Sequence, residues 1–186
     1  GEKVMDRLKR EQGAGDFVHE LYSLRVVDYM ARYGQGLNLT YAVRDGIVNH
    51  CGEKFEQAIM PDFQYKELET IDARDTYPST WEGAVVRMAD KIAYLGRDVE
   101  DAVQLKIIEK EAIPRNVAAV LGTTNSEIIS TLVSDLIETS SRKGSIGFSG
   151  EAYGAMREMK EFNYRHSYTN RILTDYHRYF ERILTT

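Results

Sequence analysis

Apolar residues recur at helical spacing along most of the chain, and the longest such stretch spans residues 85–102. The residues that share one face of this stretch are Val85, Met88, Ala89, Ile92, Leu95, Val99 and Ala102. Ser79-Thr80-Trp81-Glu82 fits the capping-box pattern, and Pro78 stands just before it. The pattern therefore predicts a long helix that starts here and continues to about Leu105. Gly83 and Gly96 lie inside it, where they lower helix propensity but permit close helix packing or close approach of a ligand.

The remaining sequence is also predominantly helical, with few strand-like alternations. Asp16 is the predicted N-cap of a helix that runs to about Tyr33, and Thr124 begins a second capping box. The other expected helices cover residues 2–12, 40–50, 53–59, 114–122, 124–140, 150–164 and 167–184, with a loop at 141–149. The sequence has no internal repeat or low-complexity linker, so we expect a single all-α domain over residues 1–186.

Composition and charge narrow the function only slightly. Hydrophobic residues make up 42% and charged residues 28% of the chain, which is typical of a globular protein. The net charge of −5 argues against an extended nucleic-acid-binding surface, but it allows a small anionic ligand held by a few cations. A single cysteine excludes an intramolecular disulfide, and no apolar run has the length of a membrane span. We therefore expect a cytoplasmic protein without membrane contact.

The polar face of the long helix carries the most informative residues. Asp90, Tyr94 and Asp98 stand at positions i, i+4 and i+8, and Arg87 and Lys91 lie beside them. Carboxylates, a phenol and a lysine in line suit a site for a metal and a phosphorylated ligand. The alternative is a solvated face with i,i+4 ion pairs, and periodicity alone favours that alternative.

Motifs spread along the chain change this balance. Ala89-Asp90-Lys91-Ile92-Ala93-Tyr94, followed by Arg97-Asp98, resembles the last motif of the HD-domain deoxynucleoside triphosphate triphosphohydrolases, the dGTPase-like family. Further segments that resemble the family, in the same order, are 23–27, 36–40, 43–50, 78–83, 125–129 and 160–164. Ordered matches over most of the chain are far more specific than one motif, so they outweigh the solvated-face interpretation.

The resemblance implies an all-α, HD-domain-like helical bundle whose reaction splits a dNTP into a deoxynucleoside and triphosphate. It implies that Asp90 is a ligand of a divalent metal such as Mg²⁺ or Mn²⁺. Lys91 and Tyr94 match positions that contact triphosphate oxygens, and Asp98 matches one that accepts a hydrogen bond from the sugar 3′-hydroxyl.

The resemblance also assigns a catalytic helix near the N-terminus. His19, followed by Glu20, matches a helix that supplies a catalytic histidine in a vertebrate member of the family. Its imidazole would protonate the leaving 5′-oxygen or assist attack by water. Many bacterial relatives have Asn and Gln where this chain has Glu20 and Tyr22. Tyr164 and Arg165 match a segment near the nucleoside only loosely.

One family motif is missing. The histidines are His19, His50, His166 and His177, and none is followed by Asp, so the His-Asp pair of the metal site is absent. Gly1-Glu2 matches the end of a Gly-His-x-Gly-Glu block. We therefore expect a bundle that is incomplete at its N-terminal side, inactive alone and without an ordered metal. The spacing of His50 and His166 gives no support to either as a substitute ligand.

Three functions follow as hypotheses. The first is part of a metal-dependent dNTP triphosphohydrolase, whose partners are the dNTP and a second copy that covers exposed apolar surface. The second is a non-catalytic nucleotide-sensing or oligomerisation module. The third is an HD phosphohydrolase that acts on another phosphoester.

Overall fold

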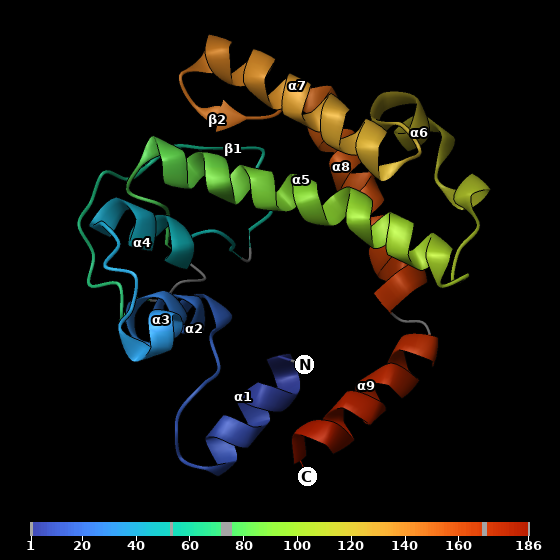
Figure 1. The fold of residues 1–186 in the computed structure, drawn as a ribbon. Coiled ribbons are helices and arrows are strands. Elements are labelled where there is room, and N and C mark those ends of the chain that lie inside the picture. The colour runs from blue at the N-terminus through green and yellow to red at the C-terminus, as the bar shows by residue number, and fades with distance from the viewer. Residues whose placement is uncertain (1, 53, 72–75, 169–170, 186) are drawn as a thin grey trace.

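The structure is a computed structural model, and it describes residues 2–52, 54–71, 76–168 and 171–185 (Figure 1). The α-helices are α1 (Glu2–Glu11), α2 (His19–Arg25), α3 (Ala31–Gly34), α4 (Tyr41–Val48), α5 (Trp81–Gln104), α6 (Arg115–Leu121), α7 (Asn125–Lys143), α8 (Gly150–Asn163) and α9 (Arg171–Thr185). Short π-helical or 3₁₀ segments are η1 (Val26–Met30), η2 (Lys110–Ala112) and η3 (Tyr164–Tyr168). The strands β1 (Ala58–Ile59) and β2 (Ile146–Gly147) form an antiparallel pair. The predicted all-α class is confirmed.

Helix α5 runs through the middle of the fold and packs against α4, α7 and α8 (Figure 1). Its residues Met88, Ile92, Leu95, Val99 and Ala102 are buried, as the apolar stripe predicts. The prediction is wrong for Val85, which is 45% exposed, and for Ala89, which is exposed as well. Arg87 takes a buried position instead, because its guanidinium reaches carbonyl groups and a carboxylate of the segment that follows α4.

Glycines allow the closest helix contacts, as predicted. A Cβ built on Gly83 of α5 would lie 3.6 Å from the Cα of Gly46 in α4 and 2.7 Å from the Cβ of Pro78. A Cβ on Gly96 would lie 3.3 Å from the Cα of Asn125, at the start of α7. Helices α4 and α5 therefore approach each other backbone to backbone.

Two helix starts show how side chains satisfy the first free N–H groups. Thr124 accepts from the backbone N–H of Glu127, whose carboxylate in turn accepts from the N–H of Thr124, so the predicted capping box is confirmed. At α5 the cap is Thr80, one residue later than predicted. Ser79 cannot serve because its hydroxyl bonds the buried carboxylate of Asp45 at 2.9 Å.

The Thr124 cap predicts a measurable stability effect. Thr124→Ala should lower the free energy of unfolding by about 1 kcal/mol, because the N–H of Glu127 loses its acceptor. Urea denaturation of both proteins measures this difference. Thr124→Ser keeps a hydroxyl and should stay close to the parent. Equal stability of the Ala variant and the parent would contradict the role of the cap.

The N-terminal third differs most from the prediction. Asp16 does not cap a helix; its carboxylate pairs with Arg10 at 3.0 Å, and α2 begins at His19 without a side-chain cap. The expected helix to Tyr33 is interrupted by the η1 turn and by left-handed φ angles of 52° and 58° at Arg32 and Tyr33. These departures come from local backbone geometry that apolar periodicity does not encode.

The short helix expected near residues 53–59 is also wrong, although residue 53 lies outside the described residues. Ala58 and Ile59 are extended and pair with Gly147 and Ile146. A Cβ on Gly147 would lie 2.8 Å from the Cα of Ala58, so a glycine is needed for this pairing. Among the helices described, none is long and apolar enough to cross a bilayer.

Candidate functional site

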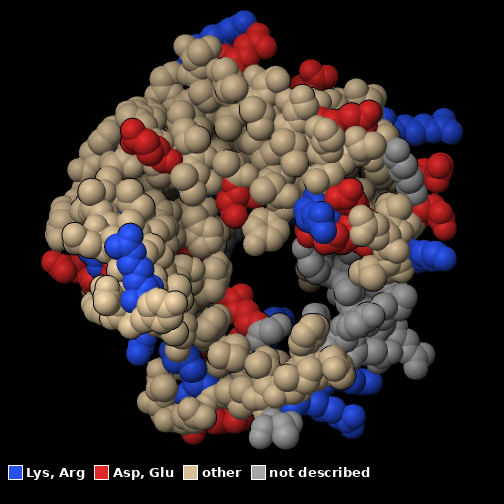
Figure 2. Space-filling view, in the orientation of Figure 1, with Lys and Arg blue, Asp and Glu red and all other residues tan. Residues whose placement is uncertain are grey.

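A pocket of about 610 Å³ lies where α5, the end of α8 and the segment after α4 meet. Its lining residues are Cys51, Gly52, Lys54, Phe55, Asp90, Lys91, Tyr94, Leu95, Asp98, Arg157, Lys160, Glu161, Asn163 and Tyr164. The molecule is hollowed at the centre of the face in Figure 2, and charged side chains of both signs stand around the hollow. A pocket with several cations beside carboxylates suits an anionic ligand that also carries hydroxyl groups.

The structure brings four of the predicted site residues together in this pocket. Asp90, Lys91, Tyr94 and Asp98 all line it, so the polar edge of α5 borders a concavity instead of open solvent. Tyr164 also lines it from η3. Arg165 does not; it lines a separate concavity with His166.

Lys91 is held in place by its surroundings. Its ammonium donates to the carboxylate of Glu56 and to the carbonyl oxygen of Lys54, the latter at 3.2 Å. Burial lowers the pKa of Lys91, although the carboxylate of Glu56 acts in the opposite direction. A lysine has three N–H donors, and these two acceptors use two of them. Counting only partners within the described residues, one N–H remains for a ligand oxygen in the pocket.

Asp90 links the pocket to two histidines. Burial raises the pKa of its carboxyl group, and the charges of His50, His19 and Lys91 oppose that change. Asp90 is therefore close enough to both imidazoles to interact with them, although they come from α2 and from the segment after α4. A half-buried carboxylate beside imidazole nitrogens is a donor set that a divalent cation can use.

The pocket residues that were not predicted include Lys54, Phe55, Arg157 and Lys160. The ammonium of Lys160 lies 4.3 Å from the ring centre of Phe55, and that of Lys91 lies 5.5 Å from the same ring. Lys160 stands in one of the segments that resemble the family, and Arg157 is one helical turn before it. Helical spacing from Lys160 could thus have found Arg157. Nothing comparable marks Phe55, which the fold places from a loop.

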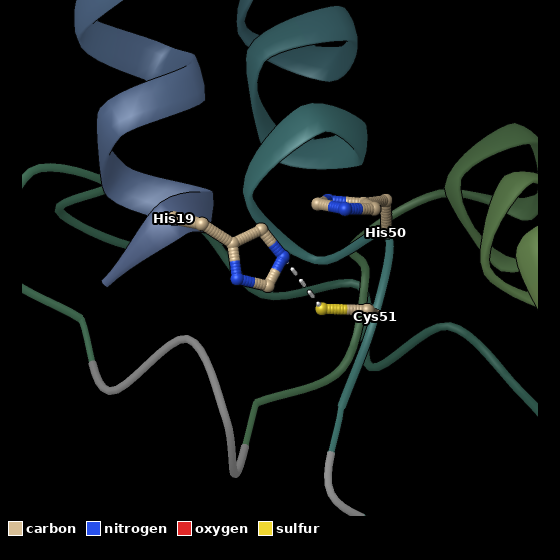
Figure 3. Close-up of side chains that lie close together, drawn as sticks. All are labelled: His19, His50 and Cys51. Carbon is tan, nitrogen blue, oxygen red and sulfur yellow. Dashed lines mark hydrogen bonds between the residues drawn. The ribbon is translucent and has the colours of Figure 1, made fainter. Parts of the chain in front are cut away.

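His19 and Glu20 do not line the pocket, but both contact Cys51, which does. Figure 3 shows His19 and Cys51 together with His50. The Nε2 atom of His19 is 3.4 Å from the sulfur of Cys51, which donates to Oε1 of Glu20 at 2.9 Å. His50 completes this group, and the ligand atoms of the two histidines and the cysteine all lie within 4.8 Å of one another. Cys51 was not predicted as a site residue, although it directly follows His50, the last residue of a segment that resembles the family.

The pKa of Cys51 reflects this environment. Burial, together with the hydrogen bond to Glu20 and the negative charges of Glu20 and Asp90, raises the pKa of the thiol to about 12. The thiol is consequently protonated at neutral pH, in agreement with its role as hydrogen-bond donor to Glu20.

Comparisons with known proteins give a consistent result. The chain is 34% identical over 169 residues to a deoxyguanosinetriphosphate triphosphohydrolase-like protein of Caldanaerobacter subterraneus subsp. tengcongensis, covering 90% of this chain and 42% of that protein. A protein of the same name from Desulfatibacillum aliphaticivorans is 36% identical over 171 residues, covering 90% of this chain and 44% of the relative. One from Clostridium tetani is 31% identical over 180 residues, covering 94% and 46%.

No family model and no solved structure matches the chain significantly. The chain spans less than half the length of the curated relatives it matches. The similarity nevertheless extends over about nine-tenths of this chain in all three comparisons, and the same name recurs. Over about nine-tenths of its length, the chain is thus similar to part of the deoxyguanosinetriphosphate triphosphohydrolase-like proteins.

Proposed function

We propose that this chain forms the nucleotide-binding part of a metal-dependent dNTP triphosphohydrolase, which converts a dNTP and water into a deoxynucleoside and triphosphate. The observation that carries the proposal is the position of the polar edge of α5, which lines the pocket opposite cationic residues of α8. The curated relatives, which are named triphosphohydrolase-like proteins, support the same reaction class. In line with the missing His-Asp pair, we propose that residues 1–186 are inactive alone.

Different pocket residues contact different parts of the proposed ligand. Lys91 offers its remaining N–H to a phosphate oxygen, and Lys54, Arg157 and Lys160 add positive charge for the rest of the triphosphate. The phenol of Tyr94 is a neutral donor for the same group. Asp98 lies one turn further along α5, where its carboxylate can accept a hydrogen bond from a sugar hydroxyl.

Asp90 is the residue we assign to the metal. Its half-buried carboxylate stands near His19 and His50, and oxygen and imidazole donors together fit a divalent cation such as Mg²⁺ or Mn²⁺. A bound cation of this kind polarises phosphate oxygens and orients the substrate. His19 is the proposed proton donor to the leaving 5′-oxygen. Glu20 positions the imidazole of His19 through the thiol of Cys51, which contacts both side chains.

Partners and location are proposed on separate grounds. We propose a homo-oligomer because α9 exposes Tyr179, Phe180 and Ile183 and because α5 exposes Val85 and Val86. A cytoplasmic location agrees with the single, unpaired cysteine.

Product analysis tests the proposal. The full-length gene product is incubated with dNTPs, NTPs and phosphomonoesters in Mg²⁺ or Mn²⁺, and the products are separated by ion-exchange chromatography. Release of inorganic triphosphate and deoxynucleoside is the expected result. Orthophosphate release would overturn it in favour of another phosphoester hydrolase, and dNTP binding without turnover would favour the non-catalytic module.

Variants of α5 test the assigned contacts. Tyr94→Phe and Asp98→Asn should each raise the KM for dNTP about tenfold, because each removes or weakens one polar contact with the ligand. Arg97→Gln is the matched control, since Arg97 lies on the same helix but pairs with Asp101 at 3.1 Å outside the pocket. An equal KM for all three variants would contradict the proposed contacts.

A further inference from the structure

The group of His19, His50 and Cys51 has the geometry of a metal site in its own right. The nitrogen of His19 and the sulfur of Cys51 are 3.4 Å apart. Two such atoms bound tetrahedrally to one Zn²⁺ stand about 3.5 Å apart, given bond lengths of about 2.0 and 2.3 Å. All three donor atoms already lie within 4.8 Å of one another, so small side-chain rotations bring them to one ion.

Hydrogen bonds orient both imidazoles for metal binding. Nδ1 of His50 is 2.7 Å from the carbonyl oxygen of Ile47, which can only accept, so this nitrogen carries the proton. Nδ1 of His19 is 3.0 Å from a carboxylate oxygen of Glu2. Each neutral ring thereby keeps its lone pair on Nε2, and in His19 that atom faces Cys51. A backbone carbonyl or carboxylate behind the far nitrogen is the usual support of a metal-binding histidine.

Glu20 supplies an independent indication of a ligand. Glu20 is only 3% exposed, and its Oε1 accepts a hydrogen bond from the thiol of Cys51. Its Oε2 is fully buried and, within the described part of the chain, has no hydrogen-bond partner, although it lies 3.3 Å from Nδ1 of His19. A buried carboxylate oxygen without a partner costs free energy unless a cation or a donor satisfies it.

We propose that His19, His50 and Cys51 form a binding site for a thiophilic divalent transition metal of the Zn²⁺ type, with Glu20 as its supporting carboxylate. Two imidazoles and a thiolate select such ions over Mg²⁺, which requires oxygen ligands. The sulfur binds as a thiolate, so the S–H proton leaves when the metal–sulfur bond forms, and Glu20 is placed to receive it.

This site shares His19 and His50 with the surroundings of Asp90, but it uses the sulfur of Cys51 instead of the carboxylate of Asp90, which is not among the three clustered donors. One consequence rests on the proposed function: Zn²⁺ bound to Nε2 of His19 withdraws that imidazole from proton transfer and inhibits hydrolysis. Binding itself requires only residues that the chain contains, so it is tested without any substrate.

Cobalt is a suitable probe, since Co²⁺ takes the place of Zn²⁺ and absorbs light. Titration of the 186-residue chain with Co²⁺ should produce a sulfur-to-cobalt charge-transfer band in the near ultraviolet, saturating at one equivalent, together with visible bands typical of four-coordinate cobalt. Addition of Zn²⁺ should abolish both. Saturation without the charge-transfer band would overturn the proposal, as would no binding at all.

Variants locate the site. Cys51→Ser should abolish the charge-transfer band, and His50→Gln should weaken Co²⁺ binding at least tenfold. His166→Gln is the matched control, because His166 is exposed and lies outside the cluster. Asp90→Asn should retain the band, which separates this site from the proposed hydrolase metal. Circular dichroism checks the fold of each variant, and a folded Cys51→Ser variant that retains the band would refute the assignment.

Discussion

Glu56→Gln is expected to lower the free energy of unfolding by about 3–5 kcal/mol, the range found when one partner of a buried ion pair is removed. Glu56 pairs with Arg87 at 2.7 Å and also with Lys91, and all three side chains are almost completely buried. The substitution leaves two buried cations without their shared carboxylate. Each of these two cations then raises the free energy of the folded state, because it has lost its hydration without gaining an ion pair.

Urea denaturation at neutral pH measures this loss. Glu138→Gln is the control, because Glu138 pairs with Arg142 at 2.6 Å on the exposed surface of α7, where an ion pair contributes at most about 1 kcal/mol. Similar losses for the two variants would show that the Glu56 cluster does not stabilise the fold.

The same residue makes stability depend on pH. Burial alone would raise the pKa of Glu56, but the hydrogen bonds from Lys91, from its own backbone and from Arg87, together with the charge of Lys91, outweigh it and lower the pKa below its ordinary value. A carboxyl group with a lowered pKa in the folded state stabilises it above the ordinary pKa of the unfolded chain. That contribution disappears as the pH falls through the lowered value. Glu56→Gln should therefore flatten the acid side of the stability profile.

Gly52→Ala is expected to destabilise the protein by about 3 kcal/mol, the upper end of the usual range for overpacking a core. A Cβ at this position would lie 2.6 Å from Cζ and 3.0 Å from Nη1 of Arg87. The guanidinium cannot move aside easily, because it donates to Glu56 and to the carbonyl oxygens of Cys51 and Thr76.

Gly154→Ala is the matched control for this substitution. Gly154 is an exposed position inside α8, and among the described residues no atom outside its chain neighbours and the nearby helix backbone lies within 4 Å of a Cβ built there. It should gain about 0.5–1 kcal/mol from the higher helix propensity of alanine. Thermal and urea unfolding of the pair measures both effects, and a neutral Gly52→Ala would show that Arg87 can be displaced without cost.

The elements that the sequence predicts well are those set by local signals. The Thr124 capping box, the helix from Arg115 to Leu121 and the buried face of α5 each follow from spacing within a few turns. The burial of Arg87 has no such signal, since its partner Glu56 is 31 residues away and comes from a loop. Charge alone suggested an exposed position for Arg87.

The residues of the candidate site also fall into two groups, those that local spacing predicts and those that tertiary packing brings together. Asp90, Tyr94 and Asp98 share one edge of a single helix, so their common placement in the pocket could be predicted from helical spacing. The meeting of His19 with Cys51 depends on how α2 packs against α4, because 32 residues separate them. Contacts of this kind are determined by tertiary packing, and the local sequence around each of the two residues contains no signal that predicts them.

The contact between Gly46 and Gly83 has a consequence for how accurately these side chains are positioned. Where two helices meet through long side chains, rotamer changes let them slide; here main chain meets main chain, and there is no compressible layer between them. Cys51 follows one helix and Asp90 lies two turns into the other. The backbone therefore fixes the distance between the two sides of the pocket that carry Cys51 and Asp90 before a ligand binds. Binding then does not have to overcome the entropy cost of bringing these two sides together.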